Sequence, residues 1–327
     1  MTKRLHIESA DPSVLPLEER TLHYLQELLV EECNEWLGRL YWDYTESSEI
    51  IQQVARIGNL PGFILLDGDN RPIAYCFWIQ EGRRVLIGDV YIISSMRGSG
   101  LDNYIIELIL HEIGRERIDR IESQNIGFGL DNATRVYQKH GFQTYQRYFM
   151  IKRLDKVRGA EPETRTWGAS PRLHFRPYHS NDLAQITRLI YESYVGRPDS
   201  EINSQYSTHS GCREFFSNLI SNTGCGRFLR TLSLVAEQEI NKRIVGAVIT
   251  TEISTGNAHL PQISVMPELQ GKGLGRKMIE ILSWRLSNAG YRTVSLAVSA
   301  LNDPAVKLYE KSGFETLLEF PVFVKTF

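Results

Sequence analysis

The sequence has few of the residues that mark disulfide-stabilised or metal-binding proteins. Its 327 residues include four cysteines, and none of them forms a C-x-x-C pair or another metal-ligand spacing. We therefore expect free thiols in a reducing cytoplasm and no metal site. A redox role stays open for Cys212 and Cys225, which lie close together in the sequence.

Long apolar runs and an excess of one charge are also absent. No stretch approaches the roughly 18 uninterrupted apolar residues of a membrane-spanning helix, and residues 1–8 contain no apolar core of a secretory signal. The formal net charge of -2 argues against a surface that coats nucleic acid. These features predict a cytoplasmic protein that binds neither nucleic acid nor a membrane.

Two motifs occur twice in the chain at almost the same offset. The sequence QGKGLG at residues 270–275 is echoed by RGSGLD at 97–102, an offset of 173 residues. The sequence YEKSGF at 309–314 is echoed by YQKHGF at 137–142, an offset of 172 residues. Because two separate echoes share nearly one offset, the pattern predicts a duplicated domain.

The two copies are separated by a polar stretch rich in glycine and proline. We expect a first domain over residues 1–153, a linker over 154–171 and a second domain over 172–327. Alternating and helical patterns in the second half predict a mixed α/β sheet in the order β-α-β-β-β-α-β-α-β. The expected elements after its first strand are a helix over 182–194, strands over 232–237, 244–251 and 259–265, a helix over 275–289, a strand over 293–298, a helix over 304–312 and strands over 314–324.

The glycines of the second copy indicate a site for phosphate. Gly271, Gly273 and Gly275 follow an expected strand and open an expected helix, so the backbone can approach a ligand closely there. The free N–H groups and positive dipole end of such a helix favour an anion. Rossmann and P-loop sites fit poorly, because neither a G-x-G-x-x-G pattern nor a Gly-Lys-Ser/Thr pattern is present. A plain tight turn is the structural alternative.

The stretch V-x-P-x-x-Q-x-x-G-x-G at 265–275 resembles the acyl-CoA loop of the GNAT acetyltransferase superfamily. Residues 302–314 resemble the later signature of the same family. The resemblance covers 172–327 well and 1–153 more faintly, and it implies two tandem GNAT domains that use acetyl-CoA or another short acyl-CoA. It also implies that the Val265 strand edge pairs with the pantetheine arm and that Asn302 and Tyr309 face the cofactor. The residues implied to hold the pyrophosphate are Gln270, Gly271, Lys272, Gly273, Leu274, Gly275 and Arg276.

Acetyl transfer to an amine requires a base, because an alkyl ammonium with a pKa of about 10.4 is mostly protonated at neutral pH. His259 lies eleven residues before Gln270, where similar family members place a catalytic Glu or His, and we expect it to be this base. Glu252 is the alternative base. Tyr309 is the expected acid toward the CoA sulfur. Each of the three also has an ordinary structural interpretation, as a packed or solvent-facing side chain.

The first copy differs from the motif at positions that cofactor binding and catalysis require. Asp102 replaces Gly275, Ser94 replaces Pro267, and Leu86 stands where a base is expected. A carboxylate facing the phosphates would repel them unless it turned away. The sequence therefore predicts a degenerate first copy that serves as a scaffold or as a wall of the acceptor cleft.

The acceptor is expected to bind along residues 196–228, and the sequence does not name it. A small amine or amino acid, an aminoglycoside and a peptide N-terminus, as for a ribosomal-protein-type N-terminal acetyltransferase, all stay open. The alternative from another class is a non-catalytic acyl-CoA sensor, for which His259 and Tyr309 would have no use. We expect a monomer whose tandem domains act as a pseudo-dimer. The acceptor-side candidates are Arg197, Asp199, Glu201, Tyr206, His209 and Arg213.

Overall fold

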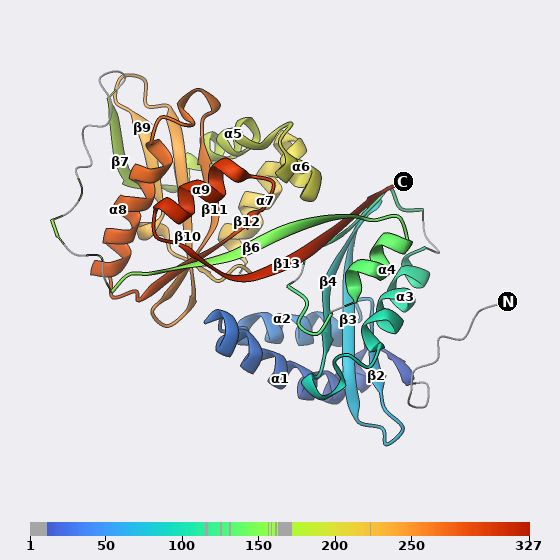
Figure 1. Ribbon diagram of the computed structural model, residues 1–327. Helices are drawn as coiled ribbons and strands as arrows, with labels where there is room; N and C mark the ends of the chain where they lie inside the picture. The colour runs from blue at the N-terminus through green and yellow to red at the C-terminus, as the bar shows by residue number, and fades with distance from the viewer. Residues whose placement is uncertain are drawn as a thin grey trace. The chain divides into compact units, whose positions relative to one another are not determined.

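In the computed structural model the chain divides into two compact units (Figure 1). The first contains residues 1–146 and 320–327, and the second contains residues 147–319. The structure describes residues 12–327 except 115, 116, 125, 131, 156, 158, 161, 163–171 and 223. Most of the linker expected over 154–171 lies outside the described residues.

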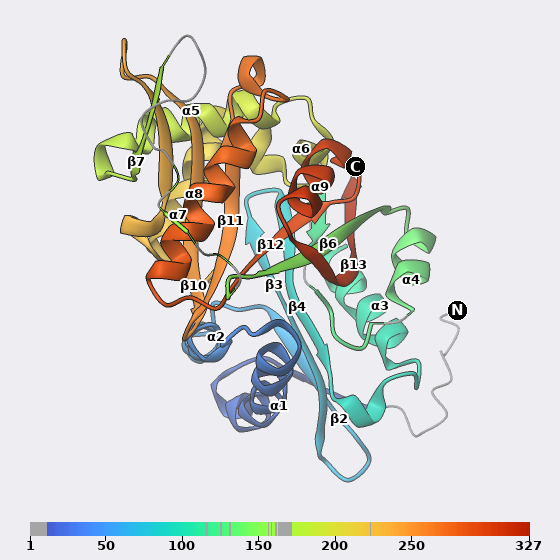
Figure 2. The same cartoon turned by 60° about the vertical axis from the view of Figure 1, so that its left-hand side comes forward.

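The first unit is a sheet with helices on both of its faces. Its strands follow the order β1-β2-β3-β4-β5-β13, and Figure 2 shows α1 and α2 on one face of β2–β4 and α3 and α4 on the other. Helix α3 is apolar along its sheet-facing side, where Ile105, Ile106 and Ile109 are fully buried. The elements are β1 (Ser13–Pro16), α1 (Leu22–Leu40), α2 (Thr45–Arg56), β2 (Gly62–Leu66), β3 (Pro72–Glu81), β4 (Arg84–Ile92), α3 (Leu101–Ile113), β5 (Arg120–Ser123), α4 (Ala133–Lys139) and β13 (Glu315–Thr326).

The second unit repeats this plan with the strand order β6-β12-β11-β10-β9-β7, and β8 pairs with β10. From β7 to α9 its elements follow the predicted order, and they add α6, α7 and β8 in the stretch predicted to bind the acceptor. The predicted last strand is β13, most of which belongs to the first unit. They are β6 (Gln143–Arg153), β7 (Leu173–Pro177), α5 (Leu183–Tyr194), α6 (Pro198–Ile202), α7 (His209–Ser221), β8 (Arg227–Phe228), β9 (Leu234–Gln238), β10 (Ile244–Ser254), β11 (Asn257–Val265), α8 (Leu274–Asn288), β12 (Thr293–Ser299) and α9 (Asp303–Lys311).

Each sheet contains a strand that the sequence places in the other half of the chain. From Arg147 onward β6 pairs antiparallel with β12, so that Arg147 lies opposite Ser299 and Arg153 opposite Thr293. The end of β13 pairs antiparallel with β5, and Phe323 lies opposite Ser123. The expected boundary at residue 153 assigned the whole of β6 to the first domain. The structure instead divides the chain at 146/147 and at 319/320. The reason is that backbone hydrogen bonds pair β6 and β13 each with a strand from the other half of the chain.

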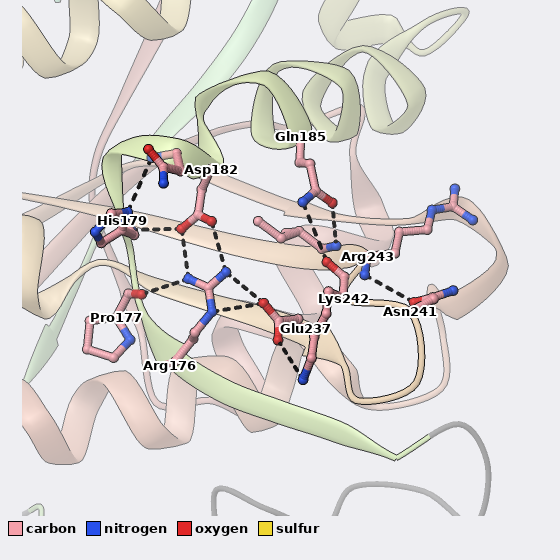
Figure 3. Close-up of polar contacts among 11 residues, drawn as sticks. Arg176, Pro177, His179, Asp182, Gln185, Glu237, Asn241, Lys242 and Arg243 are labelled. Atoms are coloured by element: carbon pink, nitrogen blue, oxygen red, sulfur yellow. Dashed lines mark hydrogen bonds and ion pairs between the residues drawn. The ribbon is translucent and has the colours of Figure 1, made fainter.

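A buried ion-pair network fixes the start of α5 on the second sheet (Figure 3). Arg176 of β7 donates to both carboxylate oxygens of Asp182 at 2.8 Å and to Glu237 of β9 at 2.8 and 3.0 Å. Asp182 also accepts a hydrogen bond from the backbone N–H of His179. Bidentate pairs of this kind are stronger than neutral hydrogen bonds and fix direction. The network therefore anchors the helix that presents Ser193 and Tyr194 to the site described next.

Candidate functional site

The candidate site begins where two neighbouring parallel strands separate. The pairing of β11 with β12 runs from Asn257↔Thr293 to Leu260↔Leu296 and then stops, although β11 continues to Val265. An irregularity in the β10–β11 register between Ile249 and Thr251 bends β11 at the same level. The last residues of β11 consequently have one edge without a neighbouring strand, and a ligand can use that edge.

A glycine turn follows β11 and leads into α8. Gly271 and Gly273 have φ values of 72° and 91°, in the region that favours glycine, and Gly273 caps the N-terminus of α8. The Gln270 side chain donates a hydrogen bond of 2.9 Å to the carbonyl of Val265, which closes the turn. In the first unit Arg97 donates to the carbonyl of Ile92 in the same way, at 3.2 and 3.3 Å. The two copies of the motif therefore form turns of similar geometry. In the second unit, the free N–H groups at the start of α8 face the turn.

A pocket of about 270 Å³ lies at this separation of strands. The glycine turn, the start of α9, the end of α5 and α6 enclose it. Of the residues predicted to bind the cofactor, Val265, Gln270, Gly271, Gly275 and Asn302 line the pocket together with Tyr309. Lys272, Gly273, Leu274 and Arg276 are not among the lining residues.

Tyr309 and Asp199 both line this pocket. Tyr309 is 9% exposed, and burial first and the Asp199 carboxylate second raise the pKa of its hydroxyl. Asp199 of α6 accepts a hydrogen bond of 2.9 Å from the side-chain amide of Asn302, whose own oxygen caps α9. Burial raises the pKa of Asp199 above its usual range, and Arg147 and Asn302 oppose that shift. The pocket therefore contains a carboxyl group that keeps its proton to a higher pH than an exposed aspartate does.

His259 lies on β11 beside the part of the strand that is still paired. It is 5% exposed and is not among the pocket-lining residues. Its Nδ1 is 2.9 Å from the Ser295 hydroxyl, and its ring stacks on Phe149 with centroids 5.8 Å apart. Burial and then the charge of Arg147 lower the pKa of His259 to about 3. An imidazole with this pKa binds a proton weakly, so the position does not favour His259 as the base.

The alternative base and the two cysteines are also held away from the pocket lining. Glu252 forms an ion pair with Arg227 and accepts a hydrogen bond of 3.1 Å from the Tyr291 hydroxyl. Burial raises the pKa of Cys212 to about 11 and also raises that of Cys225, and both thiols are free. Raised thiol pKa values disfavour the reactive thiolate, so neither cysteine has the environment of a redox centre.

In the equivalent turn of the first unit, the carboxylate of Asp102 is directed away from the turn. Asp102 is 2% exposed, and its two oxygens accept hydrogen bonds from the backbone N–H groups of Asn103 at 2.9 Å and Asn132 at 2.7 Å. Tyr137, the counterpart of Tyr309, is fully buried and its hydroxyl is 3.4 Å from that of Ser123. The Asp102 carboxylate is thus turned away, and this is the orientation in which it would not repel a phosphate.

Comparisons of the sequence with known proteins find acetyltransferases. Residues 203–325 match the family model described as "Acetyltransferase (GNAT) domain". The [Ribosomal protein bS18]-alanine N-acetyltransferase of Escherichia coli is 39% identical over 70 residues, which are 21% of this chain and 47% of that protein. The chain thus spans about half the length of the curated relatives it matches.

Solved structures resemble the whole chain in fold. A GCN5-related N-acetyltransferase from Sphaerobacter thermophilus has a TM-score of 0.68 at 16% identity, covering 96% of this chain and 95% of that one. A tandem GNAT protein from the clavulanic acid biosynthesis pathway has a TM-score of 0.62 at 11% identity, covering 97% and 98%. Residues 203–325 thus resemble a GNAT acetyltransferase domain, and the whole chain has the fold of a tandem GNAT structure. Among the described residues, no helix combines the length and apolar character needed to span a membrane.

Proposed function

We propose that this protein is an N-acetyltransferase that transfers the acetyl group of acetyl-CoA to a primary amine. The observation that carries the proposal is the pocket at the β11–β12 separation. Its lining contains residues of the glycine turn together with Tyr309 and Asp199. In this assignment the turn and the N-terminus of α8 hold the pyrophosphate, with Lys272, Gly273, Leu274 and Arg276 contributing from the turn. The pantetheine arm lies along the edge of β11 at Val265 and beside Asn302.

The chemistry assigns proton-transfer roles to Asp199 and Tyr309. Asp199 takes a proton from the acceptor ammonium, and the neutral amine attacks the thioester carbonyl to form the C–N bond. As the C–S bond breaks, Tyr309 donates its proton to the leaving sulfur, and the second proton of the nitrogen restores it. The ordinary pKa of a phenol, about 10, is already above that of a thiol, about 8.5, and burial raises the pKa of Tyr309 further. Close positioning must therefore drive this transfer.

The proton transfers are tested by pH–rate profiles of thiol release from acetyl-CoA. Asp199→Asn should lower kcat/KM at pH 7 by about 10²–10⁴-fold and remove the acidic limb of the profile. Asp303→Asn is the matched control, because that carboxylate lies in the same unit with a 65% exposed side chain, paired with Lys307. If Asp199→Asn keeps the wild-type limb and His259→Gln loses it, the base is His259.

Tyr309 is tested against a tyrosine outside the pocket. Tyr309→Phe should reduce turnover by about 10²-fold or more while acetyl-CoA affinity stays close to that of the wild type, because only the hydroxyl is lost. Tyr291→Phe removes a hydroxyl bonded to Glu252 and should leave turnover unchanged. Equal turnover in the two variants would exclude Tyr309 as the acid.

A peptide N-terminus is the second candidate acceptor, and the likeness to the ribosomal-protein alanine acetyltransferase favours it. A peptide beginning with alanine, offered beside free amines in the same assay, separates the two. A protein that binds acetyl-CoA but acetylates neither class would be the acyl-CoA sensor instead. In each case we propose a cytoplasmic protein that acts as a monomer.

A further inference from the structure

Arg147 belongs to the second unit, although it lies in the first half of the sequence. It lies on β6 opposite Ser299 of β12. Alternate residues of a strand point to the same side, so Arg147 shares a face with Phe149, whose ring stacks on His259. The exchange of strands therefore brings an arginine to the level where β11 and β12 separate.

The positive charge of Arg147 acts on four groups from different parts of the second unit, one buried and three of intermediate exposure. It lowers the pKa of His259 on β11 after the larger effect of burial. It also opposes the upward effect of burial on the pKa of Asp199 in α6, of Tyr206, and of Cys225 before β8. Asp199 lines the acetyl-CoA pocket. The charge of Arg147 thus acts on the pocket carboxylate of Asp199 and on three groups that do not line the pocket.

The guanidinium of Arg147 has few partners. Its Nη2 is 3.5 Å from the carbonyl of Ala297, and its buried Nε has no hydrogen-bond partner among the described residues. No ion pair of Arg147 is found within the described part of the chain. Arg176 in the same unit is the opposite case, because two carboxylates and a carbonyl take up its donors (Figure 3). Buried N–H donors of an arginine are normally paired, so Arg147 is prepared for an anion that arrives with a ligand.

We propose that Arg147 binds the carboxylate of the acceptor, which is a small amino acid-like molecule whose amine lies at Asp199. The inference rests on the proposed acetyl transfer and names its substrate class. A guanidinium fork matches a carboxylate with two parallel hydrogen bonds, while Asp199 attracts the ammonium group beside Tyr309. The two opposite charges of the site fit the two opposite charges of a free amino acid. A peptide N-terminus lacks the adjacent carboxylate, because an amide takes its place.

The test uses the full-length protein and matched acceptors. Free amino acids are compared with their primary amides, and ethanolamine phosphate serves as an amine with a phosphate in place of the carboxylate. We expect kcat/KM to favour the amino acids over their amides by about 10-fold to 100-fold. Arg147→Gln should remove this preference through KM for the acceptor, and Arg147→Lys should restore part of it because the charge returns without the fork.

Arg153→Gln is the control, because Arg153 lies on the same strand and is exposed. It should keep the wild-type KM, and equal melting temperatures of the three variants would show that the fold is retained. Equal acceptor KM values for Arg147→Gln and Arg153→Gln would overturn the proposal, as would a preference for the amides. A preference for ethanolamine phosphate would keep the anion site and replace carboxylate with phosphate as its ligand.

A binding experiment separates this inference from the proposed function. Calorimetry with CoA present and no acetyl group measures amino acid binding without transfer. If the wild type transfers to none of the amines yet binds amino acids, and Arg147→Gln does not bind them, the acetyltransferase proposal fails and the carboxylate site stands. If transfer occurs but binding is the same in both proteins, the carboxylate site fails alone.

Discussion

Gly275→Asp should reproduce in the second unit the carboxylate that Asp102 supplies in the first. In the first unit that carboxylate is held by the backbone N–H of Asn132 at 2.7 Å. The offset of 172 residues between the later motifs places Pro304 at the equivalent of Asn132. Proline has no backbone N–H, so an aspartate at 275 would lack this partner and would face the pocket that Gly275 lines.

The size of the effect follows from charge. A carboxylate about 4 Å from a phosphate costs on the order of 4 kcal/mol at an effective dielectric of 20, and the helix dipole returns only about 0.3–1 kcal/mol. Because a tenfold change in affinity corresponds to about 1.4 kcal/mol, acetyl-CoA should bind at least tenfold more weakly. The penalty should shrink as salt is added.

Isothermal titration of acetyl-CoA into three variants isolates the charge. Gly275→Asn matches aspartate in size, and Gly275→Ala adds a Cβ that would lie 3.1 Å from a terminal carbon of the flexible Leu308 side chain. Both neutral variants should bind within a few-fold of the wild type. If Gly275→Asp binds as tightly as Gly275→Asn, charge at this position is not what separates the two copies.

Three further outcomes are expected. Titration of the wild type should give one acetyl-CoA per chain, because only the second unit has the third glycine of the turn, Gly275, where the first unit has Asp102, and two equivalent sites would contradict this. Phe323→Ala should destabilise the first unit by about 3–5 kcal/mol in urea unfolding, because Phe323 is buried and stacks on Tyr137 at 4.1 Å; an unchanged midpoint would mean that β13 is not part of that core. Burial raises the pKa of Glu32 and of its neighbour Asp89, so stability present below the unfolded carboxyl pKa is lost as pH rises toward their folded values. Glu32→Gln should therefore gain stability over the wild type at pH 8 and lose that advantage near pH 4, and a constant difference across this range would contradict the assignment.

The duplication and the order of elements in the second half could be predicted because they depend on local patterns. Glycines at 271 and 273 require a special backbone, and the apolar spacing of α8 determines which of its sides is buried. The glycine turn was predicted from these signals and Tyr309 from the resemblance to the GNAT family, and they lie together in one pocket. Their catalytic and binding roles stay predictions.

The strand exchange and the surroundings of single side chains could not be predicted in this way. The sequence of β6 indicates a strand, but its partner is chosen by pairing between residues far apart in the chain. Arg147 was missed for that reason, since its place opposite Ser299 exists only once β6 has joined β12. His259 has a suitable place in the sequence, yet its burial and the nearby positive charge depend on the packed fold.

The exchanged strands β6 and β13 determine the order in which the two units can complete their folds during synthesis on the ribosome. The second unit has all its strands once residue 319 has emerged, whereas the first unit needs residues 320–327 to complete its sheet beside β5. The half that is synthesised first is therefore the half that finishes folding last, with the edge of β5 open to other partners in the interval. A gene cut at residue 160 would give two fragments that each lack a strand, and co-expression should yield folded protein where separate expression does not.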